Sequence, residues 1–474
     1  MKKISKINEN VTAAAAAIFL SAVFLSLVWN NNVWMDEAFT ASLVHTDIAG
    51  VIKRSMADTL PPLYNILLKL STDLFGYSTY VMKVTSVVPM ILTIALGATT
   101  VRKRFGLRTA LLFMIFITGM PLMLYYGVEI RMYSLGFFFA TASGIYAYEV
   151  IYEPTAKKWT AFTLFSVMAG YSHHFAFVTV AFSYLFLLLY FIIRKRDMIK
   201  GWLKCLLATF VLYLPCLIIT LRQFSRVSGY FSMPDIDIRM FIQYCLYPYT
   251  VGMRLATLLC GLIMLAALAV FAYGMIRGKK RDITAMYAFW CFLTYYFVLL
   301  FGTVVCHIMS ANIFVDRYLF FSTGLLWLFA AIMLSEERSF IPALVAALAV
   351  GICVYTVEWQ VEYGNTADEE IAFLREHVNE GDVYFSIGGH EEMQNCIPFY
   401  TYLDKDTAEL EFVYPLEKAI SVSRQRGTNL WITVLDGFAP SDEEQKELTD
   451  NGLTMEKMAD FDFDRYKCEM YIVR

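Results

Sequence analysis

Three carboxylates and two guanidinium groups stand in short polar segments between long apolar runs. Asp36 and Glu37 follow the first run, Glu129 and Arg131 share one segment, and Arg317 precedes a late run. A carboxylate can take a proton from a hydroxyl or amine nucleophile. A guanidinium can hold a phosphate through two parallel hydrogen bonds. Together these groups suit a site that places a cation for a phosphate, with a carboxylate nearby.

Polar and aromatic side chains in the same segments are further candidate substrate contacts: Tyr133, His173, Tyr318, Lys53 and Arg54. Two alternatives remain open for the charged groups. Glu129 and Arg131 could simply pair and close a tight hairpin, since charges near a membrane commonly pair. An acid after the first apolar run could be a solvated helix end.

Cofactors are not specified by the sequence. His173 and His174 are adjacent, whereas helical metal ligands are normally three or four residues apart, so no metal site is predicted there. The adjacent carboxylates Asp36 and Glu37 could hold Mg²⁺ or Mn²⁺ together with a substrate phosphate. A divalent cation therefore stays open, and no other cofactor is expected.

The composition of the 474-residue chain is that of a membrane protein. Hydrophobic residues make up 58% and charged residues 17%, against roughly 45–50% and about 25% in soluble domains. A net charge of −3 and the lack of a basic patch argue against a nucleic-acid partner. The nine cysteines show no spacing typical of a zinc site or a disulfide framework.

About eleven runs approach the roughly 20 apolar residues that a helix needs to cross a bilayer. They cover residues 11–29, 80–101, 109–126, 132–152, 159–173, 175–193, 202–221, 255–276, 284–309, 318–334 and 340–358. No small-residue cleavage site follows the first run, so it reads as a retained helix. The sequence therefore predicts a polytopic α-helical membrane protein.

Basic clusters indicate the orientation. They lie at residues 102–108, 157–158, 194–196 and 277–281, all in alternate connections. Cytoplasmic loops carry an excess of Lys and Arg, so these connections and the N-terminus are predicted to be cytoplasmic. The segments with Asp36, Glu129, His173 and Arg317 then face the outer side, and an odd number of spans puts the C-terminus outside.

Two outer segments could shape a binding site. Residues 30–79 contain Pro61-Pro62, and Pro is favoured in a first helical turn; we expect amphipathic helices before and after it, in the membrane interface. Residues 222–251 are rich in arginine and aromatics. They could close over a lipid-linked ligand or be an ordinary connector.

The composition changes after residue 358, which divides the chain into residues 1–358 and 359–474. An acidic stretch opens the second part, followed by a predicted helix around residues 371–378, strands at 382–387 and 429–435, and a helix starting near Ser441. This predicts a small soluble α/β domain outside the membrane.

Four segments resemble motifs of the C-type membrane glycosyltransferases, particularly the dolichyl-phosphate-mannose protein mannosyltransferase and lipid A aminoarabinose transferase group. They are Trp34-Met35-Asp36-Glu37-Ala38, Pro61-Pro62-Leu63-Tyr64, Glu129-Ile130-Arg131-Met132-Tyr133 and Asp316-Arg317-Tyr318-Leu319. One departure is that Thr59-Leu60 precedes the prolines, where a charged residue often stands in relatives. The donor or acceptor contact made there is therefore expected to differ.

The resemblance implies inverting transfer of a sugar from a polyprenyl-phosphate sugar to a lipid, glycan or protein, at the outer face of a bacterial-type plasma membrane. Asp36 matches the first-loop acid, the expected base, and Glu37 adjoins it. Glu129 and Arg131 match the second-loop element, and Arg317 with Tyr318 the element near the donor. We therefore treat residues 1–358 as a transmembrane glycosyltransferase-like domain.

Two other classes are rivals to an enzyme. A transporter or flippase for a lipid-linked sugar would place charges near the bilayer midplane, often on broken helices, whereas the spans here have few central charges. A non-catalytic anchoring protein would bind through its outer domain. Asp36 discriminates between these classes, because an enzyme should need it and a scaffold should not.

Overall fold

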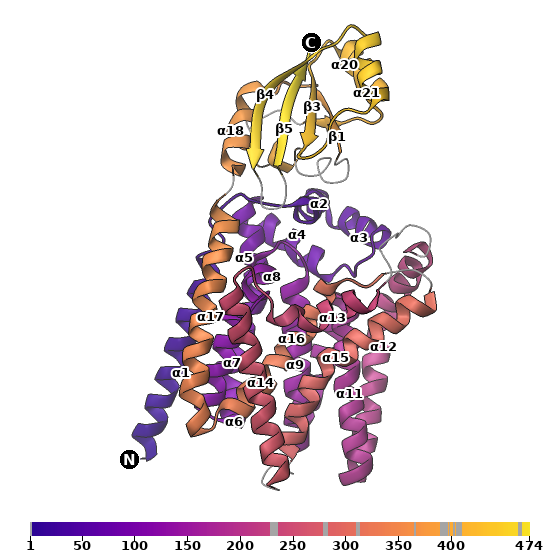
Figure 1. Cartoon of the computed structure of the whole chain (residues 1–474). Coiled ribbons are helices and arrows are strands. Elements are labelled where there is room, and N and C mark those ends of the chain that lie inside the picture. Colours follow the sequence, from indigo (N-terminus) through magenta and orange to yellow (C-terminus); the bar gives the residue numbers. More distant parts are fainter. Residues whose placement is uncertain are drawn as a thin grey trace. The chain divides into compact units, whose positions relative to one another are not determined.

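The structure is a computed structural model (Figure 1), which describes residues 2–227, 236–277, 283–309, 313–364, 366–388, 397, 399–401, 403, 410–462 and 467–474. It forms two compact units. The helical unit comprises Met1–Ser26, Ala49–Leu67 and Val84–Glu358, and the sheet unit comprises Leu27–Ile48, Leu68–Lys83 and Trp359–Arg474. The sheet unit thus includes part of the first predicted outer loop.

Every predicted span contains a helix. These are α1 (Lys2–Leu25), α5 (Thr79–Leu96), α7 (Leu107–Gly119), α9 (Tyr133–Tyr152), α10 (Ala156–Ser172), α11 (His174–Arg194), α12 (Ile199–Val227), α14 (Arg254–Ile276), α15 (Ile283–Met309), α16 (Phe320–Leu334) and α17 (Glu337–Tyr363). Within the described residues, nine helical stretches are long and apolar enough to cross a membrane. The polytopic helical fold is confirmed, and α7 and α16, at 13 and 15 residues, are the two shortest of these helices.

The third predicted span is not one helix. α7 ends at Gly119, Met120 is extended, and a second short helix, α8 (Met123–Val128), begins after Pro121. Proline disfavours helical geometry in the residue before it, which accounts for the break. Leu122 has φ 74°, a left-handed conformation rare for a residue with a branched side chain.

α9 and α16 are the central pair of the helical unit, each with 89% of its apolar window buried. Small residues allow their close approach, as is common between membrane helices. A Cβ added at Gly324 would lie 2.0 Å from Thr141 Oγ1, and one at Gly144 would lie 2.5 Å from a Leu325 methyl carbon. Most side chains of these two helices are therefore enclosed by neighbouring helices.

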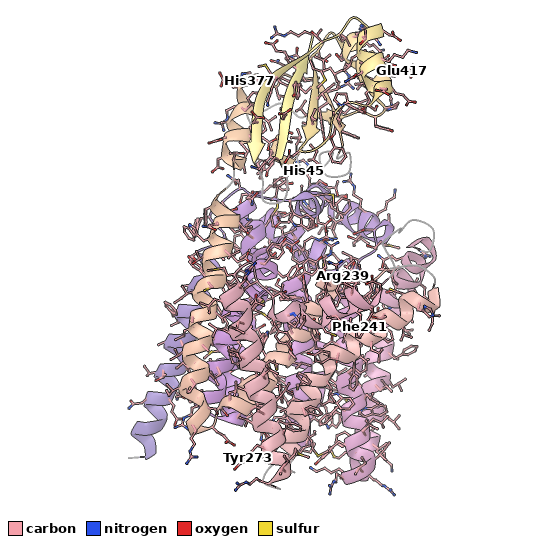
Figure 2. All side chains as sticks on the ribbon, viewed as in Figure 1. His45, Arg239, Phe241, Tyr273, His377 and Glu417 are labelled. Carbon is pink, nitrogen blue, oxygen red and sulfur yellow. The ribbon has the colours of Figure 1, made fainter. Side chains whose placement is uncertain are left out.

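One end of the helical unit carries the predicted basic connections. Glu149, near the end of α9, pairs with Arg104 of α6 (Arg102–Phe105) and with Lys158 of α10, and Lys195 Nζ donates to Ile151 O at 2.9 Å. Tyr273, which α14 places at this same end (Figure 2), packs against Arg277. Segments with positive charge from separate parts of the chain thus gather at one end.

The segment predicted as the first outer loop forms three helices, α2 (Met35–Val44), α3 (Ile48–Ala57) and α4 (Leu63–Phe75), where two were expected. α4 begins directly after the prolines, and Pro62 O accepts its first hydrogen bond from Ile66 N at 3.0 Å. In the later segment, α13 (Ile238–Leu246) and η3 (Tyr247–Tyr249) follow residues 228–235, which lie outside the described residues. Arg239 lies on α13 (Figure 2).

The C-terminal part contains a five-stranded sheet in the order β2-β1-β3-β5-β4. β1 (Val383–Ile387), β2 (Glu411–Phe412) and β3 (Leu430–Leu435) are parallel, while β5 (Lys467–Val473) runs antiparallel to β3 and to β4 (Met455–Asp462). α18 (Ala367–His377) covers one face, and α20 (Leu416–Arg426) and α21 (Asp442–Asp450) the other (Figure 1). The predicted small α/β domain is confirmed, including both predicted strands and the Ser441 cap of α21.

Candidate functional site

A cluster of polar and aromatic side chains forms where three helix junctions of the helical unit meet. We call it the arginine–tyrosine cluster: Tyr126, Glu129, Arg131, Tyr133, His173, Tyr247, Arg317 and Tyr318. Glu129, Arg131 and Arg317 all lie close enough to Tyr133 to act on it electrostatically. His173 contacts the Tyr318 ring, with 4.7 Å between centroids. Residues far apart in the sequence therefore meet in one place.

Glu129 and Arg131 lie in the short link between α8 and α9. Glu129 ends α8, and Arg131 N donates to Glu129 O at 2.6 Å, which makes a tight turn. Both side chains are almost entirely buried, at 4% and 8% exposure. A buried charge is tolerated only with partners or a ligand, so this turn is a site of concentrated, enclosed charge.

His173 is an extended residue between α10 and α11, and it caps α11 by accepting Phe175 N–H at Nδ1, 3.1 Å away. Because Nδ1 accepts, the neutral ring carries its proton on Nε2. Nε2 is buried without a hydrogen-bond partner among the described residues. Burial lowers the pKa of His173 well below its ordinary value, and His174, Arg131 and Arg317 lower it further. The imidazole is therefore a neutral donor beside two guanidinium groups.

Two tyrosines complete the cluster. Tyr126 and Tyr247 join their hydroxyls at 2.6 Å, and Tyr126 packs against Tyr133 with 4.8 Å between ring centroids. Burial raises the pKa of both Tyr126 and Tyr247, and the negative charges of Glu129 and Asp316 add to the effect at Tyr247. Both hydroxyls stay protonated at neutral pH and can donate hydrogen bonds.

Arg317 and Tyr318 belong to the short helix η4 (Asp316–Leu319), which leads into α16. Asp316 holds the start of this helix, because its carboxylate accepts Arg317 N–H at 2.7 Å. Phe321 of α16 stacks on His173 with 4.4 Å between ring centroids. Arg317 is half-buried, so its guanidinium is presented at the end of the most buried helix of the unit.

The cluster and the basic connections lie at opposite ends of the helical unit. Tyr133 begins α9 and Glu149 lies sixteen residues later on it, a distance of about 24 Å at 1.5 Å per residue. Glu149 belongs to the basic end and Tyr133 to the cluster. The predicted separation of basic loops from the Glu129, His173 and Arg317 segments therefore holds within this unit.

Lys53 and Arg54, also predicted to contact substrate, are exposed on α3. The polar contacts near them are made by other residues. Gln223 Nε2 donates to Ser55 O at 3.0 Å and to Leu60 O at 2.9 Å, and His174 Nε2 lies 3.3 Å from Thr59 O. The segment before the double proline is thus held by α12 and by the histidine next to His173.

Asp36 and Glu37 lie in the first turn of α2, in the sheet unit. Glu37 is buried, and its carboxylate accepts Trp34 N–H at 3.0 Å. A glutamate at the third helical position that reaches back to the cap residue stabilises a helix start. Asp36, half-exposed, is the acid of the pair that is more open to a substrate.

The segment that carries Asp36 is fixed within the sheet unit from both sides. Tyr77 OH donates to Ala41 O on α2 at 3.0 Å, and Tyr400 OH donates to Val33 O at 3.4 Å. Tyr77 also contacts Phe399, with 6.4 Å between ring centroids. The C-terminal domain therefore helps to position the first-loop acids, a role that the sequence pattern does not predict.

Within the described residues, no three His, Cys, Asp or Glu side chains form a group suited to a metal ion. The Glu37 carboxylate already accepts a backbone hydrogen bond. The residues present thus give a divalent cation no preformed protein cage, and Asp36 is the one acid of this pair that could contact a cation brought by substrate.

Tyr126 and Tyr247 are cluster members that the sequence reasoning did not single out. Both stand in aromatic-rich segments predicted to face outward, and tyrosine is also common there simply as a membrane-interface residue. Tyr247 comes from residues 222–251, the segment considered above as a cover for a lipid-linked ligand. Only the three-dimensional structure distinguishes these two tyrosines from the surrounding aromatics.

The low pKa of His173 predicts a stability change with pH. Below about pH 6.5 the unfolded chain takes up a proton that the folded, buried imidazole excludes, so the free energy of unfolding falls by up to about 1.4 kcal/mol per pH unit. In the His173→Gln variant this contribution is absent. We expect its apparent Tm to fall less between pH 7.5 and pH 5.5 than that of the wild type; an equal fall in both would contradict the assignment.

Comparisons with known proteins support the fold. No protein-family model matches the sequence, and no curated protein matches it. The crystal structure of ArnT from Cupriavidus metallidurans in the apo state is similar, with a TM-score of 0.64 and 12% identity over 99% of this chain and 98% of that chain. The crystal structure of ArnT from the same organism bound to undecaprenyl phosphate has a TM-score of 0.63 and 13% identity over 98% of this chain and 97% of that chain. The chain therefore shares the fold of these ArnT structures over nearly its whole length, as the resemblance of its motifs leads us to expect.

Proposed function

We propose that the chain transfers a sugar from a polyprenyl-phosphate sugar to a lipid, glycan or protein acceptor, with inversion at the anomeric carbon. The observation that carries the proposal is the arginine–tyrosine cluster, where Arg131, Arg317 and His173 come together from three separate helix junctions. Their N–H groups suit a phosphate, and the fold is shared with an ArnT structure bound to undecaprenyl phosphate.

Each residue has a distinct role in the proposed reaction. The acceptor hydroxyl or amine attacks the anomeric carbon, and the bond from that carbon to the phosphate oxygen breaks. Asp36 takes the proton of the acceptor. The phosphate leaves with its charge stabilised by Arg131 and Arg317, which lowers the barrier because preorganised donors are already in place. Attack opposite the leaving phosphate inverts the configuration.

Other side chains of the site support Asp36, Arg131 and Arg317. His173 donates from Nε2, and Tyr126 and Tyr247 donate hydroxyl protons, so the phosphate region is rich in donors that need no reorganisation. Glu37 is a positioning residue, since its carboxylate fixes the first turn of α2 next to Asp36.

A direct experiment tests the activity. Purified protein in lipid nanodiscs is incubated with polyprenyl-phosphate sugars of several sugar types and a lipid extract as acceptor, and release of polyprenyl phosphate is followed by mass spectrometry. We expect release with at least one donor, dependent on acceptor and at least about a hundredfold slower for Asp36→Asn. Sugar carried across a sealed bilayer with the phosphate bond intact would instead indicate a transporter.

The proposed orientation places the arginine–tyrosine cluster and the C-terminal domain outside and the basic connections inside. Cysteines introduced as Asp450→Cys and Asp197→Cys report on the two sides, because both aspartates are exposed. In intact cells a membrane-impermeant maleimide should label the first variant and not the second. Labelling of only the second would reverse the topology.

A further inference from the structure

The C-terminal sheet has a pocket at the edge where its parallel strands end. Its lining comes from the end of β3 (residues 434–438), the end of β4 (residues 460 and 461) and the start of β5 (residues 467–469), together with Thr366 before α18. A pocket of about 490 Å³ lies at this edge, a size within the usual range of about 300–1,000 Å³ for small-molecule sites.

Gly437 lines this pocket, and Gly388 lies under the Phe438 ring, which also lines it. Gly437 follows β3 with φ +81° in a turn in which Phe438 N–H donates to Leu435 O at 3.0 Å. Gly388 follows β1 with φ +85°, and a Cβ there would lie 2.2 Å from Phe438 Cγ. The Phe438 ring is therefore seated over a position that only glycine can occupy, yet 55% of the residue is exposed.

The charged residues of the lining are mostly acidic. Asp436, Asp460 and Glu469 contribute carboxylates, and Lys467 is the one basic residue of the lining. Lys457 Nζ holds Asp460 at 2.7 Å and Glu469 at 2.6 Å, which fixes both acids on neighbouring strands. The Asp436 carboxylate is exposed at the end of β3, with its backbone N–H donating to Lys467 O at 2.8 Å.

These features select a ligand class. Three carboxylates against two lysines, Lys467 in the lining and Lys457 beside it, leave a net negative charge that disfavours an anion such as phosphate. Ionised carboxylates accept strong hydrogen bonds from hydroxyl groups. An exposed aromatic face offers apolar contact area at low entropic cost. A sugar ring has both complementary surfaces, hydroxyls at its rim and C–H groups on its face.

We propose that this pocket, bounded by Phe438, Asp436, Asp460 and Glu469, is a carbohydrate-binding site of the C-terminal domain. A pyranose ring packs its C–H face on Phe438 and donates hydroxyl protons to the carboxylates. The site is separate from the arginine–tyrosine cluster and needs no transfer reaction. It gives the C-terminal domain a function of its own, retention of a glycan.

Binding is measured on the full-length protein in lipid nanodiscs by saturation-transfer NMR, with no sugar donor present. Maltoside detergents are avoided because their headgroup is itself a disaccharide. The probes are mannobiose and N,N′-diacetylchitobiose, with glycerol as a small polyol control. We expect saturation of the ring protons of at least one disaccharide and none of glycerol.

Variants decide whether the signal comes from this pocket. Phe438→Ala should weaken binding about tenfold, as expected for an aromatic anchor, and Asp436→Asn should weaken it less. Phe438→Trp, which keeps an aromatic face, and Asp450→Asn, an exposed acid on α21, should bind as the wild type does. Asp36→Asn should also bind normally, which separates this result from failure of the transfer activity.

Two outcomes would overturn the proposal. One is the lack of saturation transfer to either disaccharide in the wild type. The other is an equal signal in the wild type, Phe438→Ala and Asp436→Asn, which would place the sugar elsewhere on the protein.

Discussion

Asp36→Asn is expected to lower the rate of sugar transfer by about 10²–10⁴-fold, the usual contribution of a general base. Asparagine keeps the size and hydrogen-bonding shape of the side chain but cannot take the acceptor's proton. Asp36 lies in the first turn of α2 and is half-exposed, so the substitution should leave the fold intact. The measurement is release of polyprenyl phosphate, with apparent Tm measured on the same preparations.

The neighbouring acid supplies a matched control. Glu37 accepts the Trp34 N–H, and the glutamine oxygen can accept the same hydrogen bond. Glu37→Gln should therefore keep most of the activity, whereas Glu37→Ala should lower stability by about 0.5–2 kcal/mol through loss of the cap. Equal loss of activity in Asp36→Asn and Glu37→Gln, with unchanged Tm, would contradict the assignment of the base to Asp36 alone.

Arg131→Ala is expected to lower the transfer rate by about 10²–10³-fold, the effect of removing one preorganised donor from a developing negative charge. Arg131 is 8% exposed, and it lies beside His173 and Tyr133 together with Arg317. Its loss removes a positive charge from an enclosed place, where electrostatic interactions are weakly screened. The rate is measured at saturating donor, so that weaker binding does not obscure it.

Two further variants test the role of Arg131: a lysine substitution, and a double alanine variant that also removes Arg317. Arg131→Lys should recover only part of the activity, because a lysine keeps the charge without the forked pair of donors. If Arg131 and Arg317 hold the same phosphate, the double alanine variant should lose less than the product of the two single losses. Arg196→Ala, an exposed arginine at the basic end, is the control and should be as active as the wild type.

The membrane fold could be predicted because its signal is local. Each span is a run of apolar residues, and the lengths and charges of successive segments are sufficient to order them. The division between spans 159–173 and 175–193 is confirmed, because His173 is extended between α10 and α11. The break after α7 was missed, because Pro121 stands in an apolar stretch whose composition still suits a single helix.

The cluster was harder to predict because its members meet only through tertiary packing. Glu129, Arg131 and Arg317 could be identified by their charge, because charged residues next to membrane-spanning runs are costly and often functional. Tyr126 and Tyr247 are uncharged, so they do not stand out from the many other aromatic residues of the sequence. Nor does the sequence indicate that α2 is held by Tyr77 and Tyr400, contacts made across about 36 and 367 positions of the chain.

The central claim is that the arginine–tyrosine cluster binds the phosphate of a polyprenyl carrier. Native mass spectrometry of the protein with undecaprenyl phosphate and with undecaprenol, the same lipid without its phosphate, tests this most directly. We predict that the wild type retains undecaprenyl phosphate and not undecaprenol. The double variant Arg131→Ala/Arg317→Ala should no longer prefer the phosphate-bearing lipid. Equal retention of both lipids by the wild type, or undiminished preference for the phosphate in the double variant, would contradict the claim.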